Sequence, residues 1–302
     1  RISRRGYLMD AEFYNESSAL KLGWTPDWFG CSEFDEELTK AIKDYQKSIG
    51  LKADGLCGPG TYRRIWTDRE SALPFLQDEV PEHKNTSIIY NNDYYDIDWP
   101  KVVLPFMKGG MKLTKGYKKV VEKRTPTNFV CHWDVCLSSK SCFKVLQNRG
   151  LSVHFLIDND GTIYQILDMN HIAYHAGGSK WNANSIGVEI ANAYYPKHQK
   201  WYVKNGFGER PIWKEKKVHG SYLEPFMGFY DVQLQALKAL MKAVHEATGI
   251  PLETPNSSTT SAPAVRGTYK GFISHYHLKK NKIDCAGLDL KQLIIDINEG
   301  DY

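Results

Sequence analysis

The 302-residue sequence contains no apolar run of about 18 residues, so no transmembrane helix is expected. Its six cysteines are too few for a disulfide scaffold of this size. Neither sign of charge dominates, because 39 basic and 35 acidic residues leave a net charge of +4, which is too weak to predict nucleic-acid binding. The first residues, from Arg1, lack the apolar core of a secretory signal, so conventional export is not predicted.

The remaining composition is that of a folded chain. Hydrophobic residues make up 42% and charged residues 25%, which is ordinary for a globular protein. At roughly 100–200 residues per domain, this length predicts two domains. Aromatic residues reach 13%, a high share that mostly indicates core packing and less often a platform for sugars or bases. The small positive charge favours approach to an anionic polymer or envelope.

The first 75 residues contain two patterns that predict helices. Apolar residues recur at helical spacing over 34–49, and Gly50 ends that pattern. A turn-rich stretch follows over 51–60, after which Thr61 begins a second short helix that runs through Trp66. The alternative is a plain helical hairpin with a glycine turn and no ligand.

This block resembles a small three-helix peptidoglycan-binding module. The resemblance implies an all-α domain over 1–75 that holds the protein on bacterial cell wall, although a fold does not guarantee function. The matching positions are AI at 41–42, YQ at 45–46, GL at 50–51, DG at 54–55, GP at 58–59 and Thr61.

The rest of the chain divides into a connector over 76–125 and a second domain over 126–302. Predicted strands cover 127–131, 153–157, 162–167, 185–191 and 271–275, and predicted helices cover 138–148, 231–247 and 288–298. This order predicts an α/β or α+β domain, with a mixed central sheet flanked by helices.

Three residues with metal-binding side chains stand at predicted strand ends: His132, His275 and Cys285. A catalytic zinc site needs three protein ligands and leaves a fourth position for water. Their spacing alone does not establish a site, since each residue taken singly is more often a packed or surface residue than a metal ligand.

Six ordered motifs over about 126–298 resemble the type 2 N-acetylmuramoyl-L-alanine amidases, which share a fold with animal peptidoglycan recognition proteins. The resemblance implies Zn²⁺ as cofactor and hydrolysis of the bond between the lactyl group of N-acetylmuramic acid and L-alanine in peptidoglycan. The motifs are FVCHW at 129–133, VHFLID at 153–158, DG at 160–161, YHAG at 174–177, NSIGVE at 184–189, and ISH at 273–275 with DCAG at 284–287.

The resemblance also implies the metal ligands. His132 and His275 match the first two family ligands, and Cys285 matches the third, which in the family is Cys or Asp directly before Pro-Gly. Here Ala286 replaces the proline. Asp284 is the competing candidate, and Cys285 is preferred.

The family pattern assigns further roles. Glu189 is the candidate general base, with a partnered charge at the sheet edge as the alternative. Lys282 resembles the lysine that stabilises the charged intermediate. It lies three residues before Cys285, where close relatives have two, and would be in register if Asp284 were the ligand. His154, His175 and Asn184 match residues that line the substrate cleft, and a structural role is the alternative for each histidine.

The spacing of Cys136 and Cys142 matches a disulfide of peptidoglycan recognition proteins, with two free thiols as the alternative.

A module joined to an amidase domain resembles a phage endolysin, made in the host cytoplasm and released to the cell wall through a holin-type pore. A bacterial autolysin or recycling amidase and a non-catalytic peptidoglycan-binding protein are the alternatives. We expect bacterial peptidoglycan as partner, a monomer, and neither nucleic-acid binding nor membrane insertion.

Overall fold

The computed structural model describes residues 10–75, 77, 79–83 and 86–300. The chain forms two compact units, Arg1–Leu73 and Pro74–Tyr302, which are described separately. In the described part of the chain, no helix combines the length and the apolar character needed to cross a membrane.

The first unit is helical. It comprises α1 (Ala11–Leu22), the short 3-10 helix η1 (Pro26–Phe29), α2 (Glu36–Ser48) and α3 (Pro59–Glu70). The helix predicted from Phe34 therefore begins at Glu36, because the Asp35 side chain accepts from the Leu38 amide at 2.9 Å and caps it there.

The residues that carry the module pattern hold a loop inside this unit. The Gln46 amide nitrogen lies 3.0 Å from each of Asp54 Oδ1, the Leu56 carbonyl and Thr61 Oγ1. Its oxygen accepts from the Gly55 amide at 2.9 Å. Because Gln46 and Thr61 are buried, the pattern explains how the loop over 51–60 is fixed rather than how a ligand is bound.

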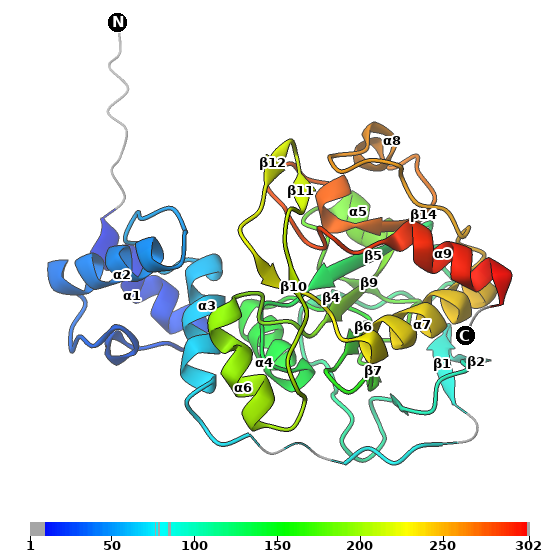
Figure 1. Ribbon diagram of the computed structural model, residues 1–302, viewed down its shortest axis with the longest axis horizontal. Coiled ribbons are helices and arrows are strands. Elements are labelled where there is room, and N and C mark those ends of the chain that lie inside the picture. The colour runs from blue at the N-terminus through cyan, green and yellow to red at the C-terminus, as the bar shows by residue number, and fades with distance from the viewer. Residues whose placement is uncertain (1–9, 76, 78, 84–85, 301–302) are drawn as a thin grey trace, which may run out of the picture. The chain divides into compact units, whose positions relative to one another are not determined.

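A six-stranded mixed sheet forms the centre of the second unit (Figure 1). The spatial order is β14 (Gly271–Ser274), β5 (Asn128–Trp133), β9 (Ser185–Ile190), β6 (Phe155–Ile157), β7 (Ile163–Gln165) and β3 (Val102–Val103). All neighbouring pairs are parallel except β6 and β7. This confirms the predicted fold class, which is a mixed sheet with flanking helices together with a helical N-terminal domain.

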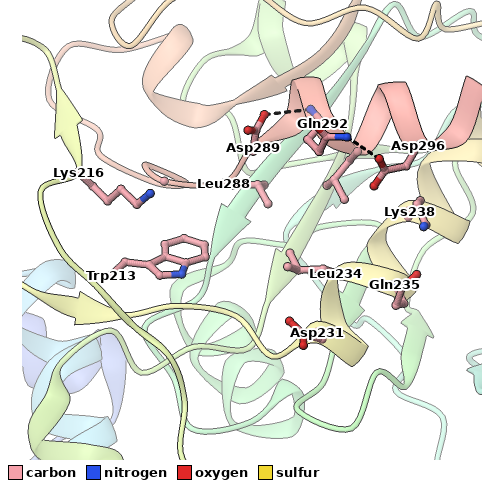
Figure 2. A pocket seen from close by; sticks show the side chains of 12 residues that line it. Trp213, Lys216, Asp231, Leu234, Gln235, Lys238, Leu288, Asp289, Gln292 and Asp296 are labelled. Carbon is pink, nitrogen blue, oxygen red and sulfur yellow. Dashed lines mark hydrogen bonds between the residues drawn. The ribbon is translucent and has the colours of Figure 1, made fainter. Parts of the chain in front are cut away.

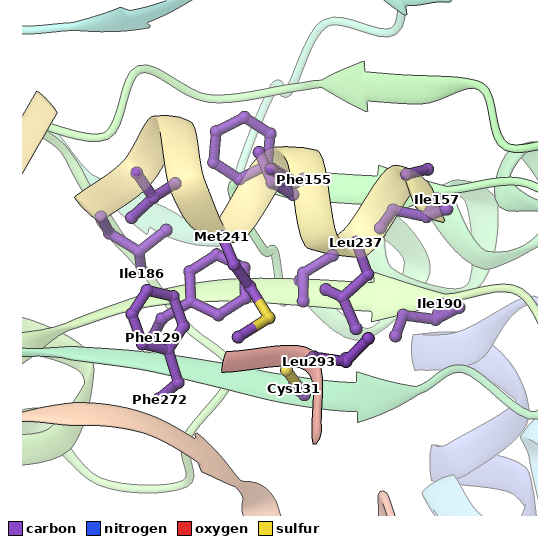
Figure 3. Packing of buried hydrophobic residues seen from close by; sticks show 14 of the residues in the cluster. Phe129, Cys131, Phe155, Ile157, Ile186, Ile190, Leu237, Met241, Phe272 and Leu293 are labelled. Atoms are coloured by element: carbon purple, nitrogen blue, oxygen red, sulfur yellow. The ribbon is translucent and has the colours of Figure 1, made fainter. Parts of the chain in front are cut away.

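Strand alternation divides the side chains between two faces. Phe129 and Cys131 of β5 and Phe272 of β14 point into the main core, where helices α7 (Asp231–Thr248) and α9 (Leu290–Glu299) cover the sheet. Figure 3 shows Leu237 and Met241 of α7 directed at these side chains. The intervening residues of the same strands therefore point to the opposite face.

The remaining elements surround this sheet. In chain order they are β1 (Ser87–Tyr90), β2 (Asp93–Asp96), β4 (Tyr117–Lys118), α4 (Ser139–Arg149), β8 (Ile172–Ala173), α5 (Ser179–Asn184), η2 (Pro196–His198), α6 (Gln199–Lys204), β10 (Ile212–Trp213), β11 (Lys217–Val218), β12 (Ser221–Tyr222), β13 (Phe226–Met227), α8 (Ala262–Arg266) and η3 (His275–His277).

Residues 76–125, expected as a connector, lie within the second unit. They contribute β1 to β4, and β3 is an edge strand of the main sheet. Ile88, Tyr90 and Val102 are buried in the main core. The described part of this segment is therefore packed structure and not a linker.

Candidate metal centre

The side chains of His132, His275 and Asp284 converge at one end of the sheet. β5 and β14 are parallel with Cys131 opposite Ser274, so the two histidines stand side by side on the face away from α7. Asp284 Oδ2 lies 2.9 Å from His132 Nδ1 and 3.0 Å from His275 Nδ1. One ligand atom from each residue falls within 4.8 Å of the other two.

The charge states of these groups suit a metal ion. Burial, followed by the nearby His275, lowers the pKa of His132 to about 4 against the opposing effect of Asp284. Burial alone would raise the pKa of Asp284, but His275 and His132 hold that pKa well below its usual range. At neutral pH His132 is therefore a neutral imidazole and Asp284 a carboxylate, the forms in which these side chains bind metals.

Two imidazoles and one carboxylate are a ligand set of catalytic zinc sites. Bonds of about 2.0–2.2 Å at tetrahedral angles put neighbouring ligand atoms roughly 3.3–3.6 Å apart. The two nitrogen–oxygen distances above are slightly shorter and need only a small separation of the side chains. The three residues therefore fit a zinc ion.

Cys285, the preferred third ligand from the sequence, does not join this group. Its side chain is fully buried in the main core, and its Sγ is not among the ligand atoms that cluster with the two histidines. Burial raises the pKa of its thiol well above the ordinary value, so it is not a thiolate. The structure thus places Asp284, the competing candidate, at the centre, and Lys282 lies two residues before it, in the family register.

Glu189 is the last but one residue of β9 and lies beside the centre. Glu189 is the cross-strand neighbour of His132 in the parallel pair of β5 and β9, so both side chains point to the same face. The side chain is only 5% exposed. A carboxylate placed next to a ligand histidine can act as the proton acceptor predicted from the sequence.

Lys282 stands half-buried in the loop before Asp284. Its charge is the last of the effects, after burial and His275, that lower the pKa of His132.

His175 contacts His132 of the candidate centre. Its Nδ1 lies 3.0 Å from His132 Nε2, and its Nε2 lies 3.1 Å from Ser185 Oγ. A Cβ atom added at Gly187 would lie 2.7 Å from the His175 ring, so only glycine leaves room for it. His175 is partly exposed and can line a cleft, but its direct contact is with His132, a candidate ligand.

His154 differs from its predicted role in the cleft. It is fully buried. Its Nδ1 accepts from the Gly187 amide at 3.0 Å, and its Nε2 donates to the His171 carbonyl at 3.0 Å. Both ring nitrogens are thus occupied by backbone groups, and the structural alternative describes this residue.

Asn184 lies half-buried at the end of α5, where its carbonyl accepts from the Thr127 amide at 2.8 Å.

Sequence reasoning missed Arg124. Its guanidinium donates to the carbonyls of Met169, Ala183 and Ser185, and it lies against His154. An arginine in a polar, lysine-rich stretch carries no sequence signal of such contacts.

All six cysteines are free thiols in this structure. Cys136 and Cys142 are buried beside Asp134, and the ligand atoms of these three residues also lie within 4.8 Å of one another. Burial, followed by a hydrogen bond with Cys136, raises the pKa of Cys142 well above its ordinary value. The predicted disulfide is therefore not formed here.

A separate pocket of about 400 Å³ lies on the α7 and α9 side of the sheet (Figure 2). Trp213, Leu234 and Leu288 give it an apolar floor, and Gln292 bonds to Asp296 at its rim at 2.7 Å. None of the predicted site residues lines it. The candidate centre is thus on the other face of the sheet.

Two family models match the chain. Residues 122–286, more than half of the sequence, match the model described as "N-acetylmuramoyl-L-alanine amidase". The chain belongs to the N-acetylmuramoyl-L-alanine amidase family. Residues 7–65 match the model described as "Putative peptidoglycan binding domain".

Individual relatives are distant. A Rickettsia conorii protein named "Putative N-acetylmuramoyl-L-alanine amidase" is 38% identical over 74 residues, which are 22% of this chain and 28% of that protein. Two solved structures show weaker similarity. The Escherichia coli amidase AmiD is 18% identical with a TM-score of 0.39, covering 61% of this chain and 66% of its own. The Clostridium intestinale endolysin LysCS is 16% identical with a TM-score of 0.39, covering 66% and 96%.

Proposed function

We propose that this chain is a zinc-dependent amidase that cleaves the amide bond between N-acetylmuramic acid and L-alanine in peptidoglycan. The observation that carries the proposal is the convergence of His132, His275 and Asp284, with Glu189 in register beside His132. Family membership supplies the reaction class.

Each side chain has a separate task in this reaction. Zinc bound by His132, His275 and Asp284 would polarise the scissile carbonyl and make water a stronger nucleophile. Glu189 takes the proton of the attacking water and later gives it to the leaving amine of L-alanine. Lys282 stabilises the negative charge that develops on the amide oxygen. His175 keeps the His132 ring in its orientation through the 3.0 Å contact.

The first unit supports a second part of the proposal, which is binding to insoluble peptidoglycan. A module that stays on the wall raises the local concentration of substrate near the centre. The pairing of a wall-binding module with an amidase domain supports a biological role as a phage endolysin, which acts on the host cell wall. An autolysin or a recycling amidase uses the same chemistry.

The decisive experiment is mass spectrometry of purified peptidoglycan digested by the zinc-loaded protein. We expect new L-alanine amino termini and intact glycan strands. Removal of zinc by a chelator should stop their release, and added zinc should restore it. New glycan reducing ends would identify a glycosidase instead. Binding to the wall without any new termini would favour the non-catalytic recognition protein.

A further inference from the structure

The hairpin of β11 and β12 connects the main core with the loop that carries Lys282 and Asp284. Val218 is 2% exposed in the main core and anchors the hairpin. His219 and Gly220 form its tip with φ angles of 53° and 85°. Two residues with positive φ are what a tight two-residue hairpin turn requires. The fold of the hairpin therefore fixes where His219 points.

The polar groups of His219 bind two separate loops. Its amide donates to the Ser258 carbonyl at 2.9 Å, and its Nε2 lies 2.8 Å from the Lys282 carbonyl. Because a carbonyl only accepts, Nε2 carries the ring proton. This leaves Nδ1 to accept from the Thr259 hydroxyl at 3.0 Å. The ring is thus a bridge between the segment at 257–259 and the loop at 279–284.

The loop at 279–284 has little regular structure of its own. The Lys282 amide donates to the Lys279 carbonyl at 3.1 Å, and the Asp284 carbonyl accepts from the Tyr276 amide at 3.0 Å. Between these two contacts, the His219 ring binds the backbone at Lys282, two residues before the carboxylate at the centre. A shift of the loop would displace both Lys282 and Asp284.

We propose that His219 is a positioning residue for the amidase reaction, because it holds the backbone of the loop that presents Lys282 and Asp284 to the centre. This inference rests on the proposed function. The proposal also gives a role to the segment at 197–228, because this segment contains the hairpin that contacts the loop.

The first test compares steady-state kinetics on a soluble muropeptide. His219→Ala should lower kcat about tenfold with KM changed less than about twofold, because the Lys282 ammonium acts mainly in the transition state. His219→Gln keeps an amide donor near the position of Nε2 and should recover most of that loss. Ser221→Ala changes an exposed side chain of the same hairpin and serves as the matched control.

A double-mutant cycle separates positioning from general damage. With Lys282→Ala already present, adding His219→Ala should cost less than about twofold in kcat. Losses that multiply to the full tenfold while one zinc stays bound per chain would overturn the inference, as would a wild-type kcat for His219→Ala. A multiplied loss that comes with release of zinc would show that His219 acts through Asp284.

Hydrogen exchange of the peptide covering 278–286 gives a readout without catalysis. His219→Ala should speed its exchange, both with zinc and after chelation, while Ser221→Ala should not. Unchanged exchange would overturn the inference even in an active amidase. A wild-type protein that releases no amino termini would instead refute the proposed function.

Discussion

At the scale of single residues, the sharpest contrast lies between the neighbours Asp284 and Cys285. Asp284→Asn should lose stable zinc binding, because the amide is a far weaker ligand than the carboxylate between the two histidines. Cys285→Ala is the matched control and should keep one zinc per chain, with a loss of about 1 kcal/mol in unfolding free energy. Zinc content by atomic spectroscopy and urea unfolding measure both effects. Zinc lost from the Cys285 variant alone would reverse the assignment.

Glu189 allows a second test at this scale. Glu189→Gln keeps the size of the side chain but removes its basicity, so kcat should fall about 10²–10⁴-fold while zinc stays bound. Amide bond cleavage and metal content are measured on the same sample. Near-normal turnover of the glutamine variant would show that another group accepts the proton.

The buried His154 predicts a pH dependence of stability. Burial, helped by Arg124, holds its pKa well below the ordinary value of 6.5. As the pH falls below about 6.5, the unfolded chain takes up a proton that the folded chain refuses, so the unfolding free energy decreases. Between pH 6.5 and 5.5 this amounts to about 1 kcal/mol. His154→Asn keeps an acceptor for the Gly187 amide and should show a correspondingly flatter pH dependence in urea unfolding.

Sequence reasoning at this scale is most direct where residues are tied to strands. His132, Glu189 and His275 lie at strand ends whose alternation could be read from their apolar neighbours. Asp284 and Cys285 lie in a turn, where no periodicity shows which of two adjacent side chains faces the centre. The spacing of Lys282 was the one signal that favoured Asp284. The burial of His154 depends on contacts with residues far away in the sequence, which no local pattern reveals.

At the scale of secondary-structure elements, the long periodic helices were predicted well. The helix expected over 231–247 is α7, Asp231–Thr248, because its apolar stripe is continuous over many turns. Strands β1, β2 and β4 were missed within the expected connector. They are two to four residues long, too short for an alternating pattern, and their stability comes from pairing and from the main core.

Arg210 is a buried side chain that helps to hold the segment at 197–228 to the sheet. Its guanidinium donates to the carbonyls of Ala191 and Gly228 and lies 4.3 Å from the ring centres of Tyr202 and Tyr230. Arg210→Lys keeps the charge but cannot make these contacts together, and should cost about 2–4 kcal/mol of unfolding free energy. Lys204→Arg, on exposed α6 surface, is the control. Equal urea midpoints for both variants would contradict this role.

At the scale of the whole molecule, the proposed function divides binding and catalysis between the two units. Gly55 has φ of 76°, and a Cβ atom there would lie 2.8 Å from the Thr39 side chain. Gly55→Val should therefore distort the loop of the first unit while the second unit keeps its fold. Hydrolysis of insoluble cell walls should fall about 10- to 100-fold, because the local substrate concentration is lost. Cleavage of a soluble muropeptide should be unchanged.

Gly60→Ala provides the control, because its new Cβ would meet only the end of the Arg64 side chain at 3.8 Å. Cosedimentation with purified peptidoglycan measures binding, and release of amino termini measures cleavage on both substrates. If Gly55→Val reduced both activities equally, the first unit would be needed for the fold or catalysis of the second. If it reduced neither, wall binding would reside in the catalytic unit. A loss confined to the insoluble substrate is the outcome that separate roles require.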